Sequence, residues 1–531
     1  MNMEIIKKSM LAALMLVAIN ISTSAQTDIR ALGAAVDTIV RTSQNTAMER
    51  NIIPKIINEV FERNNRNAAL GTRIAQAYYN YNEDAGDVYN TAVTHKRRYF
   101  HSDDSVTAMN YIRMALQTDS SYAKAYILAA DMFDYDGRTD LAMAWLEQGL
   151  KNNPKDSSLY IAEAEILART SLDAAKAKLQ EMKKLDPNFI MDRYVARIYA
   201  KIDVRGVDYL KEIADSYSKM DIKDMTMGEM ETMVGNLYFT EQRDECINKA
   251  EQCLKYYPKS LALNRFYYRA LVVNEKFKDA LPAYEKLKEA IPLKEGQVIL
   301  EREDSILYAR ALAGNKKYDE AMNMFNILLS KPDLTERFSK NIDVYISEMM
   351  RKRLKDYINL GEYQKAIDMY KEFISQRRSQ DKLTDDMISN YANIYIEWAQ
   401  ELNGTDKEST LLKADKIIED RIPETKDNDV FFSYFRLINI YFKIDGNAQT
   451  GAGIPVVNQM ETLINSKGEI SSVNKNRLLM AYRYALGYYF NAVDDYKTSL
   501  DYAYKTLDLD PENQRALDVK NYCEKRVGKR K

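Results

Sequence analysis

Apolar residues recur every three to four positions over most of the chain, which is the spacing of one face of an α-helix. Runs of alternating β-branched residues, which are typical of strands, are missing from the sequence. A clear helix pair starts near Ala123 and turns at Gly137. Its core-facing residues on the two predicted helices are Tyr126, Ala129, Ala130, Phe133, Ala142, Leu146 and Gly149. The pattern predicts antiparallel helix pairs throughout the chain, with few or no strands.

Proline stands behind the second helix of several predicted pairs. Pro154 and Pro187 are 33 residues apart, and Pro258 and Pro292 are 34 residues apart. Proline has no N–H to continue a helix and favours extended backbone in the residue before it, so each proline begins the turn to the next pair. Pro511 ends a further pair near the C-terminus. A unit of this length with two helices is typical of solenoid repeats.

Small residues occupy the same register in distant segments. Ala142 and Ala280 each stand 12 residues before a proline, and Ala321 and Ala366 hold the equivalent place in later pairs. A single methyl group at this place lets two paired helices approach closely, whereas a larger side chain would hold them apart. This register resembles that of the tetratricopeptide repeat (TPR) family. The resemblance implies an all-α, TPR-like α-solenoid superhelix of about ten antiparallel helix pairs, in which each pair buries its apolar face against its neighbours.

Departures from the repeat divide the chain into four predicted parts. Residues 1–25 form a targeting segment, and residues 26–120 form an N-terminal helical region with an insertion near 79–105. Residues 121–425 form the central array, and residues 426–531 form C-terminal repeats that end in a capping helix. A cap is expected because the outer apolar face of a terminal pair has no neighbour to cover it.

The first 25 residues have the three parts of a secretory signal peptide. Lys7 and Lys8 give a charged start, an apolar run extends from Met10 to Ile19, and small residues lead to Ala25. The apolar run is half the roughly 20 residues that a membrane-spanning helix needs, although an uncleaved anchor stays an alternative. After removal of the signal we expect no transmembrane segment. The pattern predicts an exported bacterial protein that is periplasmic, associated with the cell surface, or secreted.

Net charge and cysteine usage narrow the classes of partner. The formal net charge is −2, and it becomes −3 when Glu4, Lys7 and Lys8 leave with the signal peptide. A chain so close to neutral is not expected to bind nucleic acid. Cys246 and Cys253 are seven residues apart on one predicted helix, so their Cα atoms lie about 10 Å apart, beyond disulfide reach. We predict that both are small core residues.

Candidate catalytic chemistry is sparse. His95 and His101 are the only two histidines, although histidine is the commonest acid, base and metal ligand near neutral pH. Both lie in the insertion, where Asp103 offers a third ligand for a conceivable metal site. Phosphate-binding loops, Gly-x-Ser-x-Gly elbows and His-Glu-x-x-His helices are missing from the sequence. We expect no catalysis, no cofactor and no metal, with an enzyme site in the insertion as an alternative.

A glycine-containing loop at residues 445–454 interrupts the C-terminal repeats. Gly451 and Gly453 stand two residues apart, as in part of a dinucleotide-binding fingerprint. The strand before them and the third glycine after them are missing, however. The sequence therefore indicates a flexible turn.

The resemblance to TPR arrays also implies that outward residues of the first helix in each pair line a concave groove. Tyr135 and Tyr160 fall at such positions in two units. The candidates in the central units are all cations, namely Arg265, Arg269, Arg310, Arg351 and Lys355. Five cations on one wall form a candidate site for an anion or a peptide carboxylate. The alternative is that they are ordinary solvated charges.

Tyrosine is used heavily, with 38 residues against 15 phenylalanines. Tyr267, Tyr268, Tyr484 and Tyr488 are candidates to line the groove. Because aromatic faces stack on sugars, a carbohydrate-binding surface protein is the alternative hypothesis. The first hypothesis is a non-catalytic, exported scaffold or adaptor that binds a protein or peptide partner in its groove.

Overall fold

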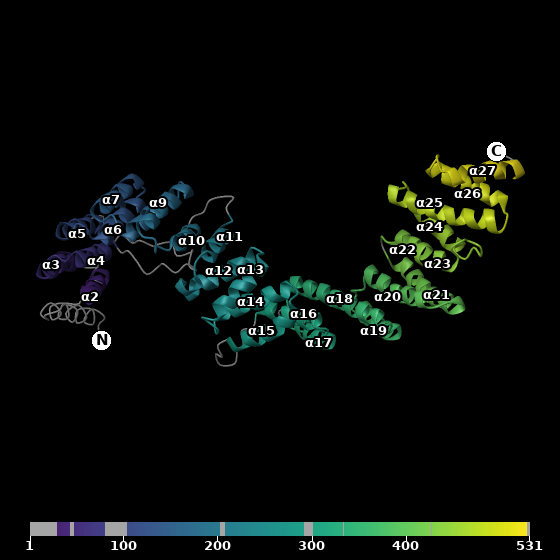
Figure 1. Ribbon diagram of the computed structural model, residues 1–531, viewed down its shortest axis with the longest axis horizontal. Coiled ribbons are helices and arrows are strands. Elements are labelled where there is room, and N and C mark those ends of the chain that lie inside the picture. Colours follow the sequence, from purple (N-terminus) through teal and green to yellow (C-terminus); the bar gives the residue numbers. More distant parts are fainter. Residues whose placement is uncertain are drawn as a thin grey trace. The chain divides into compact units, whose positions relative to one another are not determined.

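The structure is a computed structural model of the 531-residue chain (Figure 1). It describes residues 29–42, 47–79, 104–201, 208–290, 301–332, 334–425 and 427–527. The predicted signal peptide, Pro292 and the part of the insertion that holds His95, His101 and Asp103 lie outside these residues.

Every regular element in the described ranges is a helix, which confirms the predicted all-α fold class. The chain forms two compact units, residues 1–304 and residues 305–531. The boundaries expected after residues 120 and 425 fall inside these units and stay predictions.

The first unit consists of helix pairs in which each even-numbered helix from α4 to α14 packs against the odd-numbered helix that follows it (Figure 1). Helix α2 packs on α4, and α16 begins at the end of this unit. The helices are α2 (Ile29–Thr42), α3 (Ala47–Arg63), α4 (Ala68–Tyr79), α5 (Asp104–Thr118), α6 (Ala123–Tyr135), α7 (Thr139–Asn152), α8 (Ser157–Leu167), α9 (Leu172–Leu185), α10 (Met191–Lys201), α11 (Tyr209–Ser218), η1 (Ile222–Asp224), α12 (Met227–Phe239), α13 (Arg243–Leu254), α14 (Leu261–Val273), α15 (Phe277–Ala290) and α16 (Arg302–Gly314).

The second unit continues with the pairs α18/α19, α20/α21, α22/α24 and α25/α26, and α27 packs on α26. Its helices are α17 (Tyr318–Leu329), α18 (Glu336–Asn359), α19 (Tyr363–Ser379), α20 (Asp385–Trp398), η2 (Ala399–Glu401), α21 (Gly404–Arg421), η3 (Ile422–Glu424), α22 (Asp429–Arg436), η4 (Leu437–Tyr441), α23 (Phe442–Ile444), α24 (Ile454–Ser466), α25 (Ser472–Leu486), η5 (Gly487–Ala492), α26 (Tyr496–Leu509) and α27 (Gln514–Val527). The architecture is that of a TPR-like helical repeat.

Glycine and alanine set the distance between helices within and between pairs. A Cβ atom on Gly149 of α7 would lie 2.9 Å from Leu159 Cδ2 of α8 and 3.0 Å from Tyr126 Cγ of α6, closer than packed side chains allow. Gly149 therefore lets α7 contact both neighbours at once. The register alanines Ala142, Ala280, Ala321 and Ala366 are all fully buried.

The turn inside a pair repeats one geometry. Its residue with positive φ is Gly137, Glu241, Glu275, Lys316 or Gly361. In each case the next N–H donates to the carbonyl five residues earlier, as from Arg138 to Phe133 at 2.9 Å. This bond is the signature of the Schellman motif, which satisfies carbonyl groups at the end of the first helix. The turn between pairs is different and holds proline, since Pro154, Pro187, Pro258 and Pro511 follow α7, α9, α13 and α26.

The loop at residues 445–454 is tightly bonded rather than a flexible turn. The Asp445 carboxylate accepts hydrogen bonds from the backbone N–H groups of Gln449 (2.7 Å), Thr450 (3.0 Å) and Gly451 (3.0 Å). The Tyr484 hydroxyl donates a further bond to it at 2.8 Å. Burial alone raises the pKa of Asp445, but these hydrogen bonds outweigh it and hold that pKa below its ordinary value. Sequence periodicity missed this loop because its anchor comes from α25.

Helix α27 packs on α26 at the position of the predicted capping helix. It buries Ala516, Val519 and Cys523. Tyr522, which the sequence places on the apolar side, is exposed instead, and its ring lies under the Arg526 guanidinium at 4.5 Å. The stripe is rotated toward Cys523 because that small residue fits closest to α26.

The buried position of Ala280 generates a stability prediction. Replacing Ala280 with leucine forces extra atoms between helices, and we expect the free energy of unfolding to fall by about 1–3 kcal/mol. Urea unfolding followed by circular dichroism measures this change. Lys278→Leu is the control, because Lys278 is exposed on the same helix. Equal stability of Ala280→Leu and the wild type would contradict the assigned register.

Candidate functional site

The first helices of neighbouring pairs lie against one another in the first unit, as α6 does against α8 and α12 against α14. Ion pairs of about one repeat length tie this wall together. They are Asp134–Arg169, Glu165–Lys201 and Arg193–Glu229, each at 2.7 Å and 35 or 36 residues apart. Opposite charges one repeat apart are a signal that the sequence analysis did not use.

Arg265 and Arg269 of α14 bind carboxylates at the start of α16. Arg265 reaches Asp304 at 3.0 Å and Glu301 at 2.8 Å. Arg269 reaches the same two carboxylates at 2.7 and 2.5 Å, and Glu303 at 2.7 Å. Asp304 is fully buried, and the Arg269 side chain is only 6% exposed. Burial lowers the pKa of Arg269, but the adjacent carboxylates outweigh it and raise that pKa above its ordinary value.

This network corrects the expectation that Arg265 and Arg269 stand as open cations on a groove wall. Their guanidinium groups already have carboxylate partners within the first unit, so an anion from solution would have to displace them. The sequence analysis placed the two arginines on the outward face of one helix. It could not show that the next first helix brings three carboxylates to that face.

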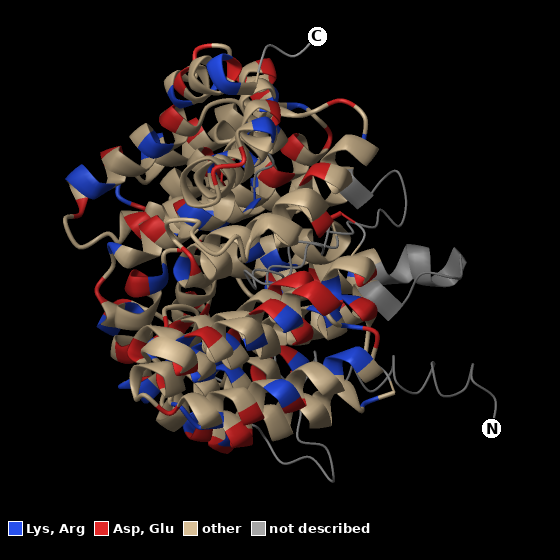
Figure 2. Cartoon of the chain, turned by 90° about the vertical axis from the view of Figure 1, so that its right-hand side faces the viewer, with Lys and Arg blue, Asp and Glu red and all other residues tan. Residues whose placement is uncertain are grey.

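The other three candidate cations belong to the second unit and differ in setting. Arg310 is half-buried, with its guanidinium carbon 4.4 Å from the centre of the Tyr345 ring. Arg351 and Lys355 are exposed on α18, one turn apart. Figure 2 shows basic and acidic residues interspersed along the helices, which is typical of solvated helix faces.

The two candidate groove tyrosines also differ. Tyr135 ends α6 and is 47% exposed, so it is open to a partner. Tyr160 is buried, and its hydroxyl donates to the Pro154 carbonyl at 3.1 Å. The expectation that Tyr160 lines an open wall is therefore wrong, because this tyrosine fastens the turn between two pairs.

Most of the tyrosines considered for sugar stacking are engaged inside the protein. Tyr268 is fully buried and donates to the Asp304 carbonyl at 3.0 Å. Tyr484 is buried on Asp445, and the Tyr267 hydroxyl donates to Glu251 at 2.7 Å. Tyr488 is half-buried and covers Gly451. Buried rings cannot offer a face to a sugar.

An aromatic cluster that the sequence analysis missed lies at the end of α12. Phe239 is 60% exposed and contacts Tyr238 and Phe266, with ring centres 5.5 Å away in both cases. The available signal was two consecutive aromatic residues at a helix end, of which only one can face the core.

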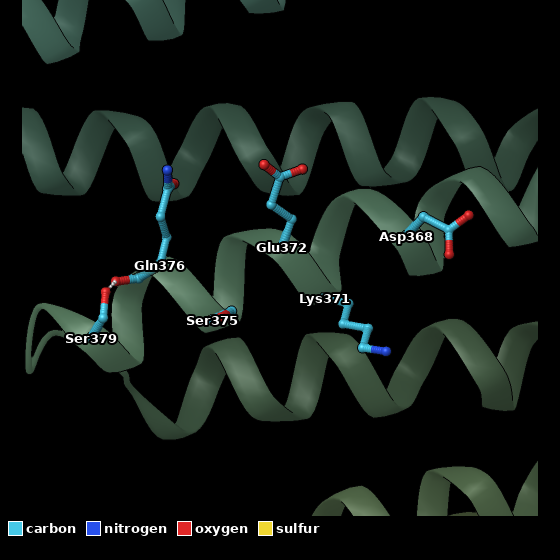
Figure 3. Close-up of a pocket in the computed structure, with 6 residues that line it drawn as sticks. All are labelled: Asp368, Lys371, Glu372, Ser375, Gln376 and Ser379. Carbon is cyan, nitrogen blue, oxygen red and sulfur yellow. Dashed lines mark hydrogen bonds between the residues drawn. The ribbon is translucent and has the colours of Figure 1, made fainter.

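An open hollow runs along the exposed face of α19 (Figure 3). Its lining residues follow the three- and four-residue spacing of one helix face and are Asp368, Lys371, Glu372, Ser375, Gln376 and Ser379. All six are polar and exposed. Ligand pockets bury apolar surface around a few polar groups, so this hollow lacks the chemistry of a small-molecule site.

Reactive groups are few among the described residues. Burial raises the pKa of the Cys246 thiol to about 12 and that of Cys253 to about 11, which keeps both protonated. The described ranges hold no group of three or more histidine, cysteine, aspartate or glutamate side chains placed to bind a metal ion. Nor does any helix in them combine the length and apolar character needed to cross a membrane.

No family model and no curated protein matches the chain. Among solved structures, the chain is similar to the C-terminal part of a TPR repeat-containing protein from Cytophaga hutchinsonii, at 15% identity and a TM-score of 0.30 over 54% of this chain and 98% of that one. It is also similar to PilW, a type IV pilus biogenesis factor, at 13% identity and a TM-score of 0.22 over 52% of this chain and 98% of that one. The TPR domain of P58(IPK) gives 11% identity and a TM-score of 0.22 over 72% of this chain and 93% of that one.

Likeness at this level assigns neither a partner nor an activity. The TPR-like repeat fold of this chain stands on its own helix pairs, Schellman turns and close glycine and alanine contacts.

The buried arginine network generates a second stability prediction. Arg269→Ala leaves the buried Asp304 carboxylate short of a partner, and we expect a loss of about 3–5 kcal/mol in the free energy of unfolding. Arg351→Ala removes an exposed cation and is expected to stay within about 0.5 kcal/mol of wild type. Urea unfolding of both variants checks this, and equal small losses would show that Arg265 alone compensates Asp304.

Proposed function

We propose that this chain is a non-catalytic scaffold or adaptor that binds a protein or peptide partner along the first helices of its pairs. The observation that carries the proposal is a repeat array whose first helices keep large apolar side chains in solvent. Tyr135 of α6, Phe239 of α12, Val344 of α18 and Phe431 of α22 are all exposed. Such side chains provide the anchors that dominate binding energy in protein interfaces.

The proposal includes export, which rests on the charged start, apolar run and small-residue site of residues 1–25. A partner in the periplasm or at the cell surface fits this route. The near-neutral net charge supports a protein or peptide rather than a nucleic acid as that partner.

The binding proposal is tested with a photo-cross-linking amino acid placed at single positions in cells that make the protein. We expect discrete adducts from Tyr135, Val344 and Phe431 on first helices. Leu185 and Leu412 are the controls, because they are exposed on the second helices α9 and α21. Adducts that form equally from both sets, or from neither, would contradict binding along the first helices.

Export is tested by sequencing the N-terminus of the protein purified from the periplasmic fraction. We expect a mature chain that starts at Gln26, because signal peptidase cleaves after a small residue such as Ala25. Ala25→Arg should leave the longer chain uncleaved. Wild-type protein that retains residues 1–25 in that fraction would contradict the proposal.

A further inference from the structure

Phe239 is the most exposed aromatic side chain in the part of the chain that the structure describes. It belongs to a three-ring cluster with Tyr238 of α12 and Phe266 of α14. The ring centres lie 5.5 to 5.6 Å apart, and Phe239 meets each of the other two rings edge to face at 76°. Such contacts hold the rings in fixed orientations without a bound partner.

The backbone beneath the cluster is adapted to it. A Cβ atom on Gly235 of α12 would lie 3.0 Å from Cε2 of the Phe266 ring. Phe266 therefore rests directly on the α12 backbone, which seats the cluster between two adjacent first helices. Because these rings are already ordered, a partner that docks on them loses less conformational entropy.

The charges beside the cluster present an acidic edge to solvent. Arg265 adjoins Phe266 in the sequence, and Arg269 follows one turn later. Both guanidinium groups point into the protein, with side chains 14% and 6% exposed. The carboxylate side chains of Glu301 and Glu303 that bind them are each 49% exposed.

The same network carries an excess of negative charge. Three carboxylates, those of Glu301, Glu303 and Asp304, bind two guanidinium groups. The negative charge of Glu303 also acts on the Tyr238 hydroxyl, so this edge borders the aromatic cluster. Arg243 is the other cation that acts on Tyr238, and the exposed Glu241 carboxylate lies 3.9 Å from it.

We infer that Phe239, Phe266 and the Glu301/Glu303 edge form a docking surface for a peptide segment that carries an aromatic or large aliphatic side chain beside a lysine or arginine. The apolar side chain packs on the two phenylalanine rings, and the basic group lies against the two half-exposed carboxylates. An acidic segment meets like charge at the same edge and is rejected. This inference rests on the proposed function and names the chemistry of its partner.

The first test selects random twelve-residue peptides displayed on phage against the immobilised full chain. We expect the recovered peptides to be enriched in an aromatic or aliphatic residue next to lysine or arginine, and to be lost on the variant Phe239→Asp. Tyr256→Asp is the matched control, because Tyr256 is 55% exposed on α13 and lies outside the cluster. Recovery of acidic peptides, of peptides that bind Phe239→Asp equally well, or of no peptide above background would overturn the inference.

The second test measures affinity by fluorescence anisotropy with the most enriched peptide. Phe239→Asp should weaken binding at least about tenfold, since a central aromatic anchor is lost, whereas Tyr256→Asp should leave it unchanged. Glu303→Gln should weaken binding of the basic peptide but not of a version with serine in place of its lysine or arginine. Equal weakening of both peptides would show that Glu303 acts only by supporting Arg269, and would overturn the assigned basic contact.

The outcome separates this inference from the proposed function. Photo-adducts from Tyr135, Val344 and Phe431 together with failure of the peptide tests would keep the scaffold and discard this surface. Success of the peptide tests with no adduct at those positions would place binding on this surface alone.

Discussion

Close approach of helices at glycine and alanine positions is the constraint on which the helix pairs depend. Gly149 lets α7 contact Tyr126 and Leu159 on two different helices, and Gly235 accepts the ring of Phe266. The buried alanines Ala142, Ala280, Ala321 and Ala366 belong to the same class of contact. Each pair thereby covers the apolar face of the next, which an isolated pair cannot do.

The same stacking decides which charges are available to a partner. Arg269 begins on an outward position of α14, but the first turn of α16 covers it with carboxylates. The exposed members of that group are then Glu301 and Glu303 rather than the arginines. A surface that the sequence marks as cationic is thus acidic where solvent meets it, and the preferred partner changes sign with it.

Much of the fold follows from local rules that the sequence states openly. Gly137 and Gly361 mark turns because glycine accepts positive φ at low cost, and Pro154 marks the start of the next pair. The site was harder to predict, because the exposure of Arg269, Tyr160 and Phe239 depends on residues 20 or more positions away. Asp445 shows the same limit, since its partner Tyr484 lies 39 residues further along the chain.

The contacts between first helices reach from one pair to the next, as between α6 and α8 or α12 and α14. A load on such an array is not shared by the whole molecule at once. Tension along the chain would peel away one hairpin at a time, starting where the seam to its neighbour is weakest, and the remaining hairpins would keep their structure. The protein is therefore suited to yield and recoil in small steps, as a spring does.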